Sequence, residues 1–165
     1  MDKNIDRDKL LCCDDSTLFA QCRCEFYKAT GRGGQKRNKT SSAVRLTHLA
    51  SSVAVTASDR RSQHENRVLA LRKLRLQLAV ELRADFIFDD SIDLAMSLKN
   101  PRYCRLVAYL LDCFYANDFD LKNSAVALHV SSSKLLKTIF RDPLLWQHVN
   151  SQREKRQLNR LKGVK

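Results

Sequence analysis

Three of the four glycines in this 165-residue chain fall within four positions, at Gly31, Gly33 and Gly34. Glycine tolerates positive φ and lets the backbone approach a ligand closely, so we expect an exposed loop whose amide groups face a partner. Gln35 directly follows these glycines. Its neutral side chain cannot serve as a general base, but it can position water and donate or accept hydrogen bonds.

Cations surround the glycines, and no acidic residue lies between Lys28 and His48. An exposed backbone flanked on both sides by basic residues suits a polyanionic ligand with one reactive centre. Nucleic acid is the natural candidate for such a ligand. The residues from which we expect RNA contacts here are Lys28, Arg32, Lys36, Arg37, Asn38, Lys39 and Arg45. The formal net charge of +12 also favours anionic partners, although it says nothing about the fold.

The triplet Gly33-Gly34-Gln35 resembles the GGQ signature of class I peptide chain release factors. The similarity extends from Tyr27 to Ala79, where the matching pieces occur in the order and at the spacing of the release-factor catalytic domain. These pieces are Gly31-Arg32-Gly33-Gly34-Gln35, Asn38-Lys39-Thr40, the run from Ser42 to His48, and Arg61-Ser62-Gln63-His64 with Asn66. We interpret this part of the chain as a GGQ domain and not as a flexible linker in a basic RNA-binding domain.

The resemblance implies that the catalytic residues are Gly33, Gly34 and Gln35. Family members cleave the ester between peptide and tRNA in the peptidyl-transferase centre of the large ribosomal subunit. The backbone amide of Gln35 would stabilise developing charge, and its side chain would exclude larger nucleophiles and orient water. The implied partners are the ribosome, peptidyl-tRNA, rRNA and a glutamine N-methyltransferase acting on Gln35. The histidines His48 and His64 have no particular Ser or Cys placed beside them, so we interpret them as structural.

Two departures from the release-factor pattern shape the functional expectation. Nothing after Leu82 resembles a codon-reading portion, and Lys36-Arg37 replaces the pair that is more usual after the glutamine. We expect ribosome-dependent peptidyl-tRNA hydrolysis without stop-codon recognition, similar to that of short GGQ proteins that rescue stalled ribosomes. The alternative is a non-catalytic ribosome- or RNA-binding module that retains the GGQ fold. A DNA-binding regulator is a further alternative, and it leaves the glycine loop unexplained.

The composition is that of an ordinary globular protein. The hydrophobic fraction of 44% and the chain length fit one core with a small appendage. No apolar run approaches the ~20 residues of a membrane span, and the N-terminus lacks the apolar region of a secretory signal. We therefore expect a cytoplasmic monomer with no membrane partner. The spacing of the six cysteines does not fit a zinc knuckle, so we expect reduced, packed thiols, no metal and no cofactor.

Alternation of apolar and polar residues predicts three strands near the loop, over 23–28, 43–49 and 53–57, with the last two forming an antiparallel hairpin. A long helix then begins at Asp59 or Ser62, and Arg67 on this helix is another candidate RNA contact. The helix carries a core stripe at spacings of three and four, namely Val68, Leu71, Leu74, Leu78 and Leu82. The predicted fold class is α+β, with a small antiparallel sheet packed on a long helix, as a GGQ domain over residues 1–83.

The rest of the chain is predicted to be an all-α C-terminal region. Residues 84–99 form an acidic connector, and residues 100–150 form a helical domain in which the pattern after Leu121 fits either a helix-turn-helix or a plain helical hairpin. Residues 151–165 form a basic tail, which we expect to be mobile and to become ordered on RNA. The candidate RNA contacts in this tail are Arg153, Lys155, Arg156 and Arg160.

Overall fold

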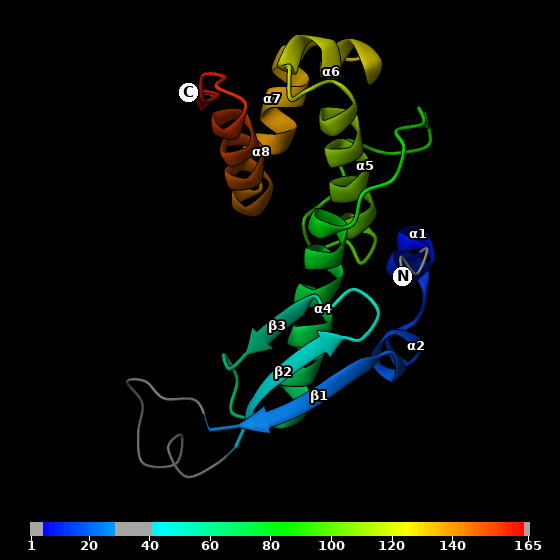
Figure 1. Ribbon diagram of the computed structural model, residues 1–165, viewed down its shortest axis with the longest axis vertical. Coiled ribbons are helices and arrows are strands. Elements are labelled where there is room, and N and C mark those ends of the chain that lie inside the picture. The colour runs from blue at the N-terminus through cyan, green and yellow to red at the C-terminus, as the bar shows by residue number, and fades with distance from the viewer. Residues whose placement is uncertain (1–4, 29–40, 164–165) are drawn as a thin grey trace. The chain divides into compact units, whose positions relative to one another are not determined.

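The computed structural model describes residues 5–28 and 41–163, and the chain divides into two compact units, 1–82 and 83–165 (Figure 1). The first unit contains α1 (Arg7–Cys12), α2 (Asp15–Ala20), β1 (Cys22–Tyr27), β2 (Ala43–His48), β3 (Ala54–Ala57) and α4 (Gln63–Glu81). The second unit contains α5 (Tyr103–Ala116), α6 (Leu121–Ala127), α7 (Ser132–Phe140) and α8 (Pro143–Lys155). The predicted α+β fold followed by an all-α region is confirmed.

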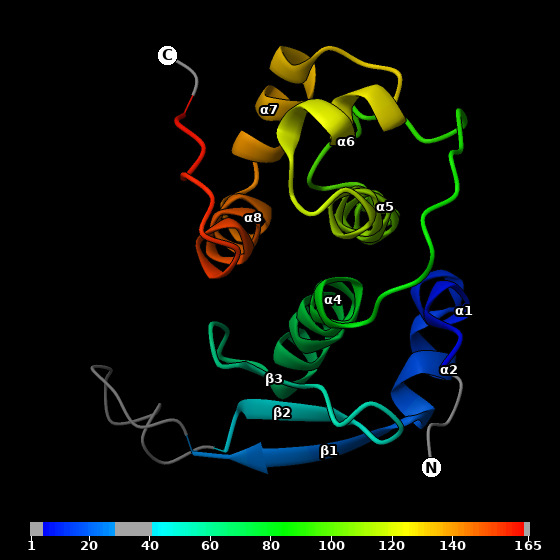
Figure 2. The same cartoon turned by 45° about the horizontal axis from the view of Figure 1, so that its top comes forward.

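The sheet of the first unit is antiparallel, in the order β1-β2-β3, and α4 lies over one of its faces (Figure 2). In the central strand β2, Val44, Leu46 and His48 are buried, whereas Arg45 between them is exposed. This alternation with a period of two gives the sheet one face toward the helix and one toward solvent. The helix meets that face with a buried stripe that includes Leu71, Leu74 and Leu78. These side chains form the apolar core of the first unit.

The turn between β2 and β3 closes the hairpin without the glycine or proline that such turns favour. Ser52 adopts the left-handed conformation instead, with φ of 58°. The backbone amide of Ser52 donates to the His48 carbonyl at 2.8 Å, and the buried His48 ring lies 2.7 Å from the Ser51 hydroxyl through Nδ1. Burial lowers the pKa of His48, which favours a neutral ring. His48 therefore stabilises this turn.

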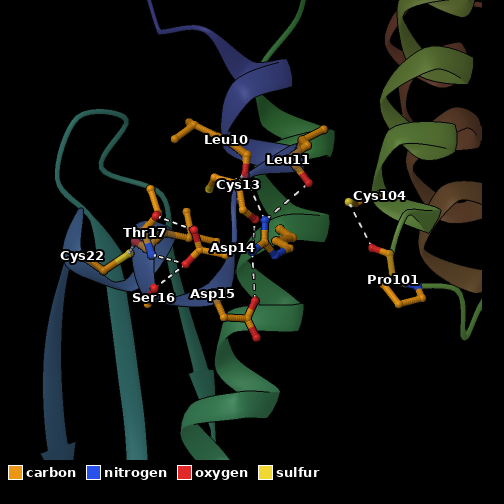
Figure 3. Close-up of polar contacts among 12 residues, drawn as sticks. Leu10, Leu11, Cys13, Asp14, Asp15, Ser16, Thr17, Cys22, Pro101 and Cys104 are labelled. Atoms are coloured by element: carbon orange, nitrogen blue, oxygen red, sulfur yellow. Dashed lines mark hydrogen bonds and ion pairs between the residues drawn. The ribbon is translucent and has the colours of Figure 1, made fainter.

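The N-terminal segment is held against α4 by one guanidinium group. Arg75 donates to the carbonyl oxygens of Leu10 at 3.0 Å and Cys13 at 2.7 Å, and it pairs with Asp15 at 2.9 Å. In Figure 3 the carbonyl groups of Leu10 and Cys13 and the carboxylate of Asp15 converge on this side of α4. The side chain of Arg75 is only 12% exposed, so these acceptors compensate for the loss of water around its positive charge. Arg75 thus joins α1 and α2 to the helix that supports the sheet.

The second unit has a core built from all four of its helices. Its largest fully buried side chains are Leu106, Leu110, Leu111, Phe114, Phe119, Leu135, Ile139 and Leu145. The stretch that we expected to be a separate connector, 84–99, lies within this unit. Phe86 packs on Tyr109 with ring centroids 5.4 Å apart, and Arg141 donates to the carbonyl oxygens of Leu94, Ala95 and Met96. None of the helices in the described ranges is both long enough and apolar enough to cross a membrane.

The expected start of a mobile basic tail at residue 151 is wrong, because α8 continues through that point to Lys155. The residues beyond the helix also bond to the unit. The amide of Leu161 donates to the Asn150 side chain at 2.7 Å, and Arg153 donates to the carbonyl oxygens of Phe119 and Asn159. The Arg156 guanidinium lies over the Phe119 ring, 4.5 Å from its centroid. Much of the basic segment is therefore part of the folded unit.

We predict that Arg75→Met releases the N-terminal helices from α4. The methionine keeps the aliphatic stem but removes the donors to Leu10 and Cys13, which we expect to lower the local stability by about 2–3 kcal/mol. Hydrogen exchange of the α1 and α2 amides measures this change. Arg72→Met is the matched control, since Arg72 is exposed on the same helix. Equal protection of α1 and α2 in the two variants would contradict the assigned role.

Candidate functional site

The predicted catalytic loop connects two neighbouring strands. Strands β1 and β2 pair along their whole length, and Tyr27 at the end of β1 lies opposite Ala43 at the start of β2. The chain therefore leaves and re-enters the sheet at adjacent positions, and this pairing fixes the two ends of the connection. The predicted site residues that lie outside the described ranges are Arg32, Gly33, Gly34, Gln35, Lys36, Arg37, Asn38 and Lys39.

Two side chains from the start of α4 hold the returning end of this connection. Gln63 donates to the Ser41 carbonyl at 2.6 Å, and Asn66 donates to the Ser42 carbonyl at 2.7 Å. Asn66 is fully buried, and it also bonds both backbone groups of Arg60, accepting from the amide at 2.9 Å and donating to the carbonyl at 2.8 Å. One buried amide thus ties together the loop end, the segment before α4 and α4 itself.

The sequence contains a partial signal for this positioning role. Gln63 and Asn66 belong to the pieces that resemble release factors, but the resemblance gives them no individual role. Polar residues three apart at a helix start lie on one face of the first turn. The structure shows that the backbone carbonyls of Ser41 and Ser42 occupy that face. The spacing alone does not show which distant backbone groups the side chains of Gln63 and Asn66 bond.

Of the predicted RNA contacts near the loop, Lys28 and Arg45 lie within the described residues, Lys28 directly after β1 and Arg45 on the exposed face of β2. Both are exposed, and the Arg45 guanidinium lies 5.8 Å from the centroid of the Tyr27 ring. Glu25 stands opposite Arg45 in the strand register, so this face is not purely cationic. Arg67 is placed differently, since it is half-buried and lies over the Phe19 ring at 5.2 Å. Arg67 thus packs against Phe19 of α2, and its contact with RNA stays a prediction.

The predicted tail contacts differ in how firmly the second unit holds them. Arg153 and Arg156 are half-buried, and Phe119 receives a hydrogen bond from the first and a cation–π contact from the second. Lys155 and Arg160 are exposed, and Arg160 pairs with Glu154 at 3.3 Å. An exposed pair of this kind contributes little to stability and is screened by salt. Lys155 and Arg160 are therefore the more accessible of the four cations.

The described residues do not form a conventional catalytic or metal site. His64 is exposed, and its Nδ1 lies 3.4 Å from the Arg67 guanidinium. Burial raises the pKa of the Cys22 and Cys113 thiols to about 11, which leaves them largely protonated and poorly nucleophilic at neutral pH. Within residues 5–28 and 41–163, no group of three or more His, Cys, Asp and Glu side chains is arranged to hold a metal ion.

Comparison with known proteins agrees with this geometry. Residues 18–86 match the family model described as the RF-1 domain, a range that contains β1, the loop, the sheet and α4. The chain is 46% identical over 65 residues to peptide chain release factor 1 of Acidiphilium cryptum, covering 39% of this chain and 18% of that protein. It is 49% identical over 59 residues to peptide chain release factor 2 of Paramagnetospirillum magneticum, covering 36% of this chain and 16% of that protein.

The match is confined to one part of each protein. The aligned stretches span less than one fifth of these relatives, and the RF-1 match stops at residue 86, four residues into the second unit. The family therefore describes the unit that carries the glycine loop and does not describe helices α5 to α8. Over residues 18–86, the chain is thus similar to the RF-1 domain, and the relatives that it matches there are peptide chain release factors 1 and 2.

Proposed function

We propose that this protein hydrolyses the ester of peptidyl-tRNA on the ribosome. The observation that carries the proposal is the sequence Gly33-Gly34-Gln35 on the connection between β1 and β2 of an RF-1 domain. The described residues supply a rigid base for that connection, through the strand pairing and the Asn66 hydrogen bonds. A reactive group held on rigid elements can be positioned well enough for catalysis by orientation.

In the proposed mechanism, the ribosome holds the ester and the loop completes the site. The backbone amide of Gln35 donates to the charge that develops at the reacting centre or on the departing ribose hydroxyl. The Gln35 side chain orients water and excludes larger nucleophiles, while Gly33 and Gly34 leave room that a Cβ would occupy. The large ribosomal subunit, with its rRNA and peptidyl-tRNA, is the proposed partner. A glutamine N-methyltransferase acting on Gln35 belongs to the same proposal.

We further propose that hydrolysis does not require a stop codon and serves ribosome rescue. The support is that α5 to α8 lie outside the RF-1 match and form a helical unit with a core of their own. The exposed cations Lys28, Arg45, Lys155 and Arg160 are proposed to contact rRNA phosphates. Contacts of this type fix position without reading sequence, as a codon-independent factor requires.

The first test concerns the loop. We predict that Gly34→Ala and Gln35→Ala retain ribosome binding but lose peptide release by about 10²–10³-fold. Gly34→Ala adds a Cβ where clearance is needed, and Gln35→Ala removes the side chain that orients water. Single-turnover release from stalled ribosome complexes measures this loss. Gln77→Ala on α4 is the matched control and should keep full activity. Full release by both loop variants would leave the non-catalytic binding module as the better description.

The second test concerns codons. Release should proceed at the same rate whether the ribosomal A site holds a stop codon, a sense codon or no mRNA, because contacts to phosphates do not read sequence. Otherwise identical ribosome complexes that differ only in this codon provide the measurement. A preference of tenfold or more for stop codons, which is about 1.4 kcal/mol, would refute codon independence.

A third test concerns the support of the loop. Asn66→Ala leaves the Arg60 backbone groups and the Ser42 carbonyl without their partner, so we expect a loss of about 2–4 kcal/mol in stability. At a temperature where the variant stays folded, release should still fall, by up to about 10²-fold, because the loop end is no longer fixed. Asn123→Ala, at an exposed helical position, is the control. A destabilised variant with normal release would limit Asn66 to a role in folding.

A further inference from the structure

Helices α6 and α7 form a compact pair that the RF-1 domain does not explain. They are joined by a tight turn in which His129 adopts the left-handed conformation, with φ of 54°, at a position where glycine is usual. The Val130 amide donates to the Ala125 carbonyl at 3.0 Å, and the Ser131 hydroxyl caps α7 by accepting from the Lys134 amide at 3.2 Å. Two short helices joined by such a turn have the connectivity of a helix-turn-helix.

The second helix of this pair has two chemically distinct sides. Leu135, Thr138 and Ile139 are buried, whereas Ser133, Lys134 and Lys137 are exposed. The segment from Leu121 to Arg141 contains four lysine or arginine residues and no acid. In the part of the chain that the structure describes, neither Lys134 nor Lys137 forms an ion pair with a carboxylate. Two ammonium groups one helical turn apart are thus available to an external anion.

A groove of about 430 Å³ runs beside these lysines, between α7 and the stretch that contains Leu94 and Ala95. Its α7 side is lined by Ser131, Ser133, Lys134, Lys137, Thr138 and Arg141. The opposite segment carries four acids, of which Asp89 accepts from the amide and hydroxyl of Ser91, and Asp93 accepts from the Ala95 amide at 2.8 Å. None of the four acids lines the groove, and the side chains on its α7 side carry hydroxyl, ammonium and guanidinium groups.

We propose that this face of α7 docks on the phosphate backbone of double-stranded RNA. Lysine is a point charge that suits phosphate, whereas the planar, forked groups of Arg, Asn and Gln are best suited to bidentate contacts with base edges. The only such side chain on α7 or at its C-cap, Arg141, is committed to three backbone carbonyls of residues 94–96. The face can therefore hold phosphates but offers no free forked group for bidentate base contacts, which fits the shape-based recognition of RNA duplexes.

The choice of RNA over DNA rests on the proposed function, because a protein that acts on ribosomes meets folded rRNA. The docking itself rests on the charge and hydroxyl groups of α7 and does not involve Gly33 to Gln35. Loss of peptide release in the Gln35 variant and loss of duplex binding in an α7 variant are thus separate observations. Either one can fail while the other holds.

The test measures binding of the full-length protein to an RNA duplex of about 20 base pairs by fluorescence anisotropy, at several salt concentrations. The variant is Lys134→Gln with Lys137→Gln, which removes two charges at exposed helical positions. The matched control is Lys99→Gln with Arg102→Gln, which removes two exposed charges from the same unit. Thermal unfolding should be the same for both variants, since none of the four side chains is buried.

We expect the α7 variant to lower the slope of log affinity against log salt by about two, because each phosphate contact contributes about 0.9. Its loss of affinity between about 50 and 200 mM salt should consequently be about tenfold smaller than that of the control. Equal slopes in the two variants would overturn the docking surface in favour of a general effect of net charge. The choice of RNA would be overturned if the protein bound a DNA duplex of the same length as tightly as the RNA duplex or more tightly, and if the α7 variant lowered the salt slope for DNA as well.

Discussion

The packing of α4 on the sheet is the interaction on which the first unit depends. The buried side chains of β2 and the leucine stripe of α4 form one apolar layer, and the predicted catalytic loop begins and ends at the edge of that layer. Asn66 sits fully buried at the same helix start, where its amide bonds the Ser42 and Arg60 backbone. A buried amide is tolerated only when its hydrogen bonds are made, so this residue couples the position of the loop end to the stability of the core.

Several arginines have a structural use in the parts of this cationic chain that the structure describes. Arg75 joins the N-terminal helices to α4, Arg141 gathers the carbonyls of residues 94–96, and Arg153 bonds the Phe119 carbonyl. The planar guanidinium with its several donors suits such convergent backbone acceptors, and it holds its charge when partly buried. Lysines such as Lys134, Lys137 and Lys155 instead remain exposed. Net charge alone would therefore overstate the number of cations that are available to RNA.

The two units pose different functional questions. The first carries a sequence pattern shared with release factors, and its proposed chemistry depends on a loop amide placed by a rigid sheet. The second lies almost entirely outside that match, yet it has its own core and an acid-free helical pair. In the proposal, the first unit supplies hydrolysis. The exposed lysines of α7 are the surface of the second unit that we propose to bind duplex RNA.

The sequence by itself determined the α+β architecture, because strand alternation and the leucine stripe of the long helix are local patterns that tertiary packing had only to bring together. The Gly-Gly-Gln triplet is likewise a local motif, so the sequence alone was enough to identify the candidate site. Only the tertiary structure decided that the 84–99 stretch packs on the second unit and that the basic segment folds back on Phe119 through Arg153 and Arg156. A charged run looks the same in sequence whether it is solvated or bound to backbone carbonyls, since the acceptors that decide between these outcomes lie far away in the chain.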